Sequence, residues 1–215
     1  ITLVSFMTGL NKMLDNLVLN QTPHIHIFNE IEPSLKQPIS LHKNFDGAVN
    51  VIHSIKPKQS QKKIHNAVPI LKYLNTNTMV KGATPQLRAQ IFYISGSIEI
   101  GGNLTGIHVM EEARLSNFGD YIIKGTPENL ENSENGILLG AGLAEKMSLE
   151  VGDRVQVSTI RGDVFPLKIV GLYQSGIADI DNIQSFVNLK TAQRILGEAG
   201  NYVTDINIKL YDIGG

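Results

Sequence analysis

The chain contains no cysteine and no tryptophan. The lack of cysteine excludes disulfides, thiolate metal sites and cysteine nucleophiles. Aromatic residues make up only 6% of the sequence, which is little for a surface that stacks nucleic-acid bases or sugars. The 19 Lys and Arg nearly balance the 20 Asp and Glu, so the net charge of −1 provides no field for a phosphate backbone or anionic lipid. Nucleic acid is therefore excluded as a partner class.

The sequence also lacks the common catalytic motifs, including a P-loop and the G-x-S-x-G nucleophile turn. Gly140-Ala141-Gly142 follows an apolar run and opens a short helical pattern, as a phosphate-binding loop would. The sixth position of that pattern is Glu145, whose carboxylate would repel a pyrophosphate, so a structural turn is expected instead. Likewise, Arg161-Gly162-Asp163 lies between two alternating segments and predicts a hairpin turn rather than an adhesion motif.

Two histidines and two acidic pairs are the remaining candidates for a chemical site. His24 and His26 would share one face of a strand, but chance strand histidines are favoured over a zinc site because a third ligand at suitable spacing is missing. The neighbouring carboxylates 111–112 would point apart, as would Asp179 and Asp181, whereas an acid/base pair must converge on one point. We therefore expect no catalytic residues, no metal and no cofactor.

A length of 215 residues with 42% hydrophobic residues allows one large domain or two small ones with a real core. Hydrophobic periodicity predicts a mixed α+β fold with mainly antiparallel sheets. The arrangement of the predicted elements differs between the two halves of the chain. In the first half we expect strands at 24–28, 64–74, 78–81 and 87–100, with a bulge at Gly96, and a helix at 48–55. In the second half we expect strands at 137–140, 154–159, 165–170, 185–189 and 203–210, and helices at 141–147 and 191–196.

The first twenty residues predict a helix of about 30 Å, which becomes amphipathic after Gly9. Their apolar residues recur at helical spacing. The uncharged run 1–11 is too short to span a bilayer, which requires about 20 residues. Two interpretations stay open: an amphipathic helix packed on the core, or a membrane helix that continues as a stalk. In the second, the residues facing lipid or a partner are Leu3, Val4, Phe6, Met7 and Leu10.

Five segments of the chain, in the same order, resemble lipoprotein-releasing ABC transporter permeases of the LolC/LolE family. They are residues 22–27, 104–125, 136–155, 167–181 and 186–197. The third resembles the family's "Ile-Leu-Gly … Leu-Ala … Val-Gly-Asp" block, and the fourth its "Val-x-Gly-hydrophobic-Phe-x-Ser-Gly … Asp" signature. His108 and Val109 depart from the pattern, since the family usually has Asp and Pro there.

The resemblance implies a two-lobed MacB-like periplasmic core that lies between two transmembrane helices. Residues 1–20 would form the stalk, 21–112 with 184–213 a Porter-like lobe, and 113–183 a Sabre-like lobe. It also implies a bacterial inner-membrane protein whose domain is extracytoplasmic and non-catalytic. Its partners would be a cytoplasmic ATP-binding subunit, a second permease subunit and a lipoprotein cargo.

The same resemblance makes docking of a periplasmic carrier doubtful. The family's carrier-binding subunit uses a long protruding hairpin, whereas the matching turn here spans only residues 160–164. This sequence therefore looks more like the lipoprotein-receiving partner subunit or a more distant homologue. The alternatives are the same domain in a macrolide- or peptide-exporting permease, and a free-standing extracellular binding module.

Overall fold

The computed structural model describes residues 23–30 and 62–211. Its strands are β1 (Ile25–Phe28), β2 (Val80–Ser95), β3 (Ile98–Ile107), β4 (Ile122–Lys124), β5 (Gly136–Gly140), β6 (Arg154–Ser158), β7 (Val164–Tyr173), β8 (Gln184–Asn188) and β9 (Asp205–Leu210). Its helices are α2 (Ala67–Thr76), α3 (Val109–Ser116), the 3₁₀ turn η3 (Phe118–Tyr121), α4 (Pro127–Glu131), α5 (Ala141–Lys146), α6 (Ala178–Asp181) and α7 (Leu189–Ile195).

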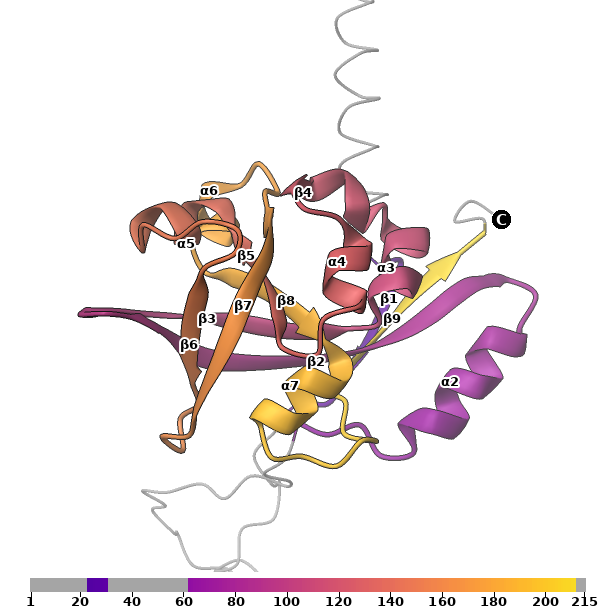
Figure 1. Ribbon diagram of the computed structural model, residues 1–215. Helices are drawn as coiled ribbons and strands as arrows, with labels where there is room; N and C mark the ends of the chain where they lie inside the picture. Colours follow the sequence, from indigo (N-terminus) through magenta and orange to yellow (C-terminus); the bar gives the residue numbers. More distant parts are fainter. Residues whose placement is uncertain (1–22, 31–61, 212–215) are drawn as a thin grey trace, which may run out of the picture.

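The sheet is organised around β2, its longest strand. One edge of β2 pairs with β3, and the other edge pairs first with β9 and then with β6. Because β6 also pairs with β7, the strands β2, β3, β8, β5, β7 and β6 follow one another around a closed ring. Strands β9 and β1 extend this sheet from β2 (Figure 1).

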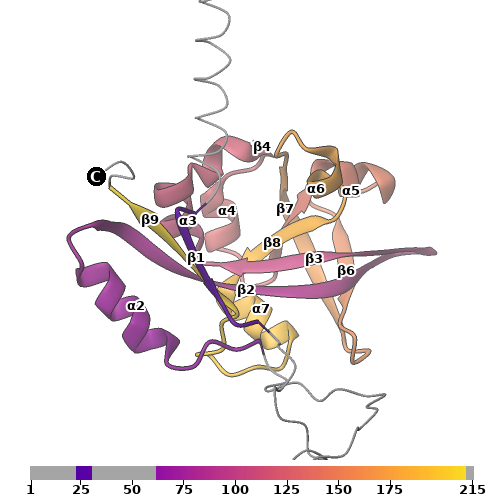
Figure 2. The same cartoon turned by 180° about the vertical axis from the view of Figure 1, so that it is seen from behind.

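Alternation along β2 separates an inner face from an outer one. Leu87, Ile91 and Tyr93 are almost completely buried and belong to the main core, whereas Arg88 and Phe92 between them are exposed. Helices α2 and α7 lie on one side of the long strands and α3 and α4 on the other, as Figures 1 and 2 show. These helices leave part of the outer face of β2 and β3 uncovered, and the candidate site lies on that part.

The structure confirms the predicted mixed α+β class and the mainly antiparallel pairing. Only β3–β8 and β5–β7 are parallel among the strand pairs of the described chain. The predicted hairpin turn is also present, because β6 ends at Ser158, β7 begins at Val164 and Gly162 between them has a φ of 88°. Most second-half elements agree with their predicted ranges to within a few residues.

The prediction of a strand at 64–74 is wrong, because these residues lead into and form helix α2. Ile70, Leu71 and Leu74 pack against the main core, and together with the buried Ala67 they have the i, i+3, i+4, i+7 spacing of a helix face. Pro69 lies in the first turn, where proline is tolerated because no intrahelical donor is needed.

The predicted bulge at Gly96 is also wrong. Ser95 pairs with Ile98, so Gly96 and Ser97 form a two-residue hairpin turn that separates β2 from β3. Gly96 has a φ of 59°, a backbone conformation that such tight turns demand and glycine adopts without strain.

The predicted helices at 1–20 and 48–55 lie outside the described residues. The division into a Porter-like and a Sabre-like lobe stays a prediction. Strands from both predicted lobes pair within one sheet. No helix within 23–30 and 62–211 is both long and apolar enough to cross a bilayer.

Candidate functional site: a polar groove on the outer sheet face

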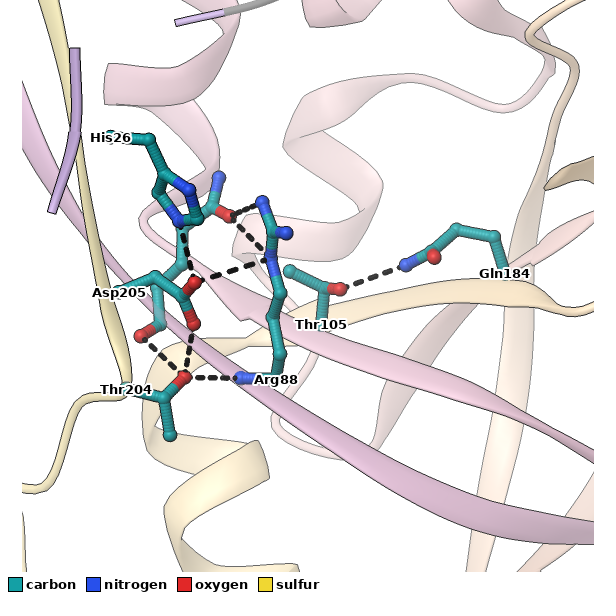
Figure 3. Close-up of polar contacts among 7 residues, drawn as sticks. His26, Arg88, Thr105, Gln184, Thr204 and Asp205 are labelled. Atoms are coloured by element: carbon teal, nitrogen blue, oxygen red, sulfur yellow. Dashed lines mark hydrogen bonds and ion pairs between the residues drawn. The ribbon is translucent and has the colours of Figure 1, made fainter. Parts of the chain in front are cut away.

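A groove of about 890 Å³ runs along the outer face of the sheet. The strand register places Gln90 beside Asn103 and Arg88 beside Thr105, and Asn103 in turn lies beside Gln184 of β8. The Gln184 amide donates to the Thr105 hydroxyl at 2.8 Å (Figure 3). The floor of the groove is therefore a row of side-chain amides and hydroxyls, which can donate and accept hydrogen bonds.

Four aromatic rings close one end of the groove. Phe186 lies 4.8 Å from Tyr173 and 4.9 Å from Phe118 between ring centroids, and Tyr121 lies 6.0 Å from Tyr173. Burial, helped by the nearby charge of Asp181 and by Tyr121, raises the pKa of Tyr173 to about 12. Its phenol is therefore neutral at ordinary pH. The ring forms an apolar wall, and the hydroxyl can donate and accept a hydrogen bond.

Arg88 and Thr204 also line the groove, and both contact the buried carboxylate of Asp205 (Figure 3). His26 Nε2 donates to Asp205 Oδ1 at 2.6 Å, since a carboxylate can only accept, and the Thr204 hydroxyl donates to Oδ2. Arg88 Nε lies 3.9 Å from Oδ1, and its guanidinium donates to Gln86 Oε1 at 3.2 Å. The Asp205 side chain is only 9% exposed, so these partners replace the water that its charge would otherwise require.

The network joins strands that are far apart in the sequence. His26 comes from β1, Asp205 from β9 and Arg88 from β2, and the Arg88 main-chain N–H donates to Thr204 Oγ1 at 2.9 Å. Main-chain pairing already aligns these strands, and the side chains add a polar clasp on their outer face. We call His26, Arg88, Thr204 and Asp205 the clasp.

A second buried carboxylate ties α3 to β2. Glu112 accepts from the hydroxyls of Thr84 and Ser116, each at 3.0 Å. Burial and the like charge of Lys81 lower the pKa of Lys209, whereas Glu112 acts in the opposite direction. Both carboxylates thus hold elements together through fixed hydrogen bonds, and this is the arrangement of a structural network.

The structure also places the chemical candidates raised by the sequence. His24 and His26 both have partners within the sheet, because His24 Nδ1 accepts from the Leu210 N–H at 3.1 Å. Within residues 23–30 and 62–211 no three His, Asp or Glu side chains gather as metal ligands. Glu112 is buried while Glu111 is exposed, so this acidic pair does point apart as expected.

The Gly140-Ala141-Gly142 segment forms a close structural contact. A Cβ at Gly140 would lie 2.2 Å from the Asp181 carbonyl oxygen, and one at Gly142 would lie 2.3 Å from Asn182 Oδ1. Asp181 itself accepts from the Ser175 N–H at 2.7 Å and holds the loop before α6. These glycines are therefore explained by packing against α6.

Sequence reasoning did not find the groove or the clasp. Their signal was the polar alternation of Gln86, Arg88 and Gln90 along one strand, but the partner strands that complete the site are remote in sequence. The predicted membrane- or partner-facing residues Leu3, Val4, Phe6, Met7 and Leu10 lie outside the described part of the chain.

Comparison with known proteins gives a consistent family. The family model described as the MacB-like periplasmic core domain matches residues 1–213. The lipoprotein-releasing system transmembrane protein LolC of Neisseria meningitidis is 29% identical over 66% of this chain and 36% of its own length. LolC of Buchnera aphidicola is 25% identical, and LolE of Haemophilus influenzae 21% identical, each over 97% of this chain and 46% of its own length. The chain therefore spans less than half the length of these curated relatives.

Two solved structures share the fold. The periplasmic region of MacB from Actinobacillus actinomycetemcomitans matches with a TM-score of 0.51 and 14% identity, covering 72% of this chain and 69% of that one. The extracellular domain of the ABC-type transporter YknZ from Gram-positive bacteria matches with a TM-score of 0.53 and 12% identity, covering 88% and 85%. At these identities the likeness concerns the fold alone, and it agrees with the predicted MacB-like core.

Proposed function

This chain belongs to the family of MacB-like periplasmic core domains, and from that premise we propose that it is the extracytoplasmic domain of an ABC transporter permease. Its relatives named as lipoprotein-releasing transmembrane proteins support lipoprotein release as the process. In this role the domain performs no chemistry. It transmits the motion that ATP drives on a cytoplasmic subunit to the outer side of the inner membrane.

The observation that carries this proposal is the pairing of β1 with β9. Ile25 pairs with Ile208, and the His24 N–H donates to the Ile208 carbonyl at 2.9 Å. The two ends of the described fold, Pro23 and Tyr211, consequently leave the sheet side by side. A domain inserted between two membrane helices needs this arrangement, because both helices then act on one point of the sheet.

The clasp supports transmission through that point. Force arriving on β1 or β9 is shared with β2 through main-chain pairing and through Asp205. Strand β2 continues into the closed ring, so a displacement of the paired ends moves the ring as a whole. Coupling between distant sites requires two states of the permease that differ in their contacts. In this proposal, the contacts that differ are those of the paired ends and the clasp.

The proposed partners are an ATP-binding subunit, a second permease subunit and an acylated lipoprotein. Carrier docking by this domain is not proposed. The connection between β6 and β7 comprises only residues 159–163, and a strand gains about 3.3 Å per residue, so this hairpin is short for a protruding hook.

The experiment uses the full-length protein purified from its membrane in mild detergent with its associated subunits. The complex is reconstituted into liposomes that carry a fluorescently labelled, acylated lipoprotein. We expect an ATP-binding subunit in the purified complex and ATP-dependent release of the lipoprotein. Hydrolysis of ATP without release, combined with transport of a macrolide or a peptide, would replace the proposed cargo, and the absence of any ATP-binding subunit would refute the permease assignment.

The clasp provides a matched pair of variants for the same assay. Asp205→Asn removes the buried charge that joins β1, β9 and β2, whereas Asp179→Asn makes the same chemical change at an exposed position. We expect Asp205→Asn to lower the number of lipoproteins released per ATP hydrolysed and Asp179→Asn to leave it unchanged. Equal ratios in both variants would show that the clasp takes no part in coupling.

A further inference from the structure

The groove brings a cation, a hydroxyl and an aromatic ring into one row across three strands. Arg88 of β2 pairs with Thr105 of β3, and Thr105 pairs in turn with Phe186 of β8. Directly paired residues project from the same face of a sheet, and all three of these residues line the groove. Because neighbouring strands are about 4.8 Å apart, about 10 Å separates the Arg88 backbone from that of Phe186. The row therefore joins a charged side chain to an apolar one within the length of a small molecule.

The guanidinium of Arg88 keeps donors that the protein does not use. Its side chain is 51% exposed. Nε and Nη2 both donate to Gln86 Oε1, at 3.4 and 3.2 Å, whereas no group of the described residues accepts from Nη1. The neighbouring carboxylate of Asp205 already accepts from His26 and Thr204, and it lies 3.9 Å from Arg88 Nε. The unused N–H groups of a planar guanidinium match an oxyanion such as a carboxylate or a phosphate.

The other charged side chains that line the groove favour an anion as well. They are Lys62, Arg161, Glu112 and Glu198. Glu198 lies 3.3 Å from Arg161, and Glu112 accepts from two hydroxyl groups at 3.0 Å. Both carboxylates that line the groove therefore have partners, and the cations Lys62 and Arg88 can attract a negative charge from the ligand.

Apolar side chains line the groove on the far side of β3 from Arg88. The rings of Phe186 and Tyr173 are 4.8 Å apart between centroids, and both residues are only partly buried. Ile180 of α6 lines the same groove and is 39% exposed. Apolar surface that stays accessible beside an exposed cation matches a ligand that is itself charged at one end and apolar at the other.

We propose that the groove binds a small anionic amphiphile, which is an oxyanion head group joined to a short apolar chain. Arg88 holds the head group, and the Thr105 hydroxyl, which accepts from Gln184 at 2.8 Å, donates its own proton to it. The chain lies against Phe186 and Ile180. The groove volume of about 890 Å³ is within the range of about 300–1,000 Å³ that is typical of small-molecule sites. A fatty-acid carboxylate and a lipid phosphate share this chemistry, and the proposal goes beyond the proposed function without depending on it.

A binding test compares four ligands on the ¹⁵N-labelled 215-residue chain, each ligand below its micelle concentration. Octyl phosphate and octanoate carry the two anionic head groups, octyl glucoside carries the chain on an uncharged head group, and inorganic phosphate has no chain. NMR shifts of the Thr105, Gln184 and Phe186 amides give each Kd. We expect a Kd on the order of 1 mM or lower for octyl phosphate or octanoate, and at least fivefold weaker binding of octyl glucoside and inorganic phosphate. The tighter of the two anionic ligands identifies the head group.

Two matched pairs of variants test the two sides of the groove. Arg88→Gln removes the cation, whereas Arg154→Gln makes the same change at an exposed position that does not line the groove. Ile180→Ser removes part of the apolar side, whereas Ile177→Ser changes a 52% exposed isoleucine that does not line it. We expect Arg88→Gln to weaken binding of the anionic ligand at least fivefold without changing that of octyl glucoside, and Ile180→Ser to weaken it about threefold. Both controls should keep the Kd of the unmodified chain.

Several results would overturn the proposal. Octyl glucoside that binds as tightly as the anionic ligands would show that the head group is not recognised, and inorganic phosphate that binds as tightly would show the same of the chain. A Kd above about 1 mM for both anionic ligands, or equal effects of Arg88→Gln and Arg154→Gln, would also refute it. The ligand comparison uses the unmodified chain, so it decides the question even if a variant does not fold. None of these results bears on whether the full-length protein carries an ATP-binding subunit, so failure here and failure of the proposed function are separate outcomes.

Discussion

The clasp on Asp205 makes the sharpest prediction for stability. Replacing Asp205 with Ala removes the acceptor shared by His26 and Thr204 while leaving their donors next to a mostly buried site. Strand β1 is then held to β9 by main-chain pairing alone. We expect the 215-residue chain to remain folded and to lose stability measurably.

The size of this loss follows from the hydrogen bonds that His26 and Thr204 donate to Asp205 and from the low exposure of the Asp205 side chain. A hydrogen bond to a charged group contributes about 1.5–3 kcal/mol, and loss of the carboxylate also removes its desolvation cost, so the sum is reduced. The Arg88 guanidinium adds little, because it is 3.9 Å away and half-exposed, and such pairs contribute less than about 1 kcal/mol. We therefore expect Asp205→Ala to lower the free energy of unfolding by about 2–3 kcal/mol.

Two further variants fix the order of effects. Asp205→Asn keeps an oxygen that accepts from His26 but loses the charge, so it should cost about 1–1.5 kcal/mol. Arg88→Ala should cost less than about 1 kcal/mol. Urea unfolding followed by circular dichroism measures all three, and with a slope of about 2–3 kcal/mol per molar the midpoint of Asp205→Ala should fall by about 1 M.

The order of these effects tests the reasoning more strictly than their size. If Arg88→Ala destabilised the chain as much as Asp205→Ala, the guanidinium would be the main partner of the carboxylate, contrary to the distances in the structure. If Asp205→Ala changed the midpoint by less than the experimental error, the clasp would contribute nothing to the attachment of β1.

Three other predictions concern the core, the aromatic wall and the α6 loop. Gly106→Ala would place a Cβ 2.4 Å from the Ala192 Cβ and should cost about 1–3 kcal/mol in urea unfolding, whereas Gly200→Ala, with open space around it, should change stability by less than about 0.5 kcal/mol. The pKa of Tyr173 is raised from 10.0 to about 12, so the folded state favours the neutral phenol; its stabilising contribution is complete below pH 10 and is lost as the pH rises to about 12. Alkaline unfolding of Tyr173→Phe should therefore be less steep, and an unchanged profile would contradict this. Asp181→Ala removes the acceptor of the Ser175 and Gly176 N–H groups, and their hydrogen exchange should accelerate about tenfold or more while exchange in β7 stays slow.

The accuracy of the sequence predictions depended on how local their signals were. The hairpin around Gly162 was predicted correctly because its turn residue and both alternating strands are contiguous. Helix α2 was mistaken for a strand because its branched residues have a high β-propensity, and only packing on the core selects the helical face of Ile70, Leu71 and Leu74. The i, i+3, i+4 spacing was present in the sequence, so this error was avoidable.

The groove and the clasp could not have been predicted in the same way. Asp205 reads as one polar residue in an alternating strand, and its importance comes from His26, which is 179 residues away in the sequence. Likewise, the floor of the groove combines Gln90 of β2 with Asn103 of β3 and Gln184 of β8, which the strand register brings side by side. The polar alternation of Gln86, Arg88 and Gln90 is their one local trace, and both features are completed only by the order of strands in the sheet.

The family resemblance succeeded where local patterns did not, and the packing around α6 gives a physical reason. The glycines at 140 and 142 belong to one family-like block, and Ser175, Gly176 and Asp181 belong to another. In the fold these blocks meet: Gly140 lets the Asp181 main chain approach, while the Asp181 carboxylate holds the loop at Ser175 and Gly176. A Cβ at Gly140 would displace Asp181 and release that loop, so the two blocks depend on each other. Their joint presence therefore indicates one specific packing arrangement, and this is why the resemblance predicts the fold better than it predicts the cargo.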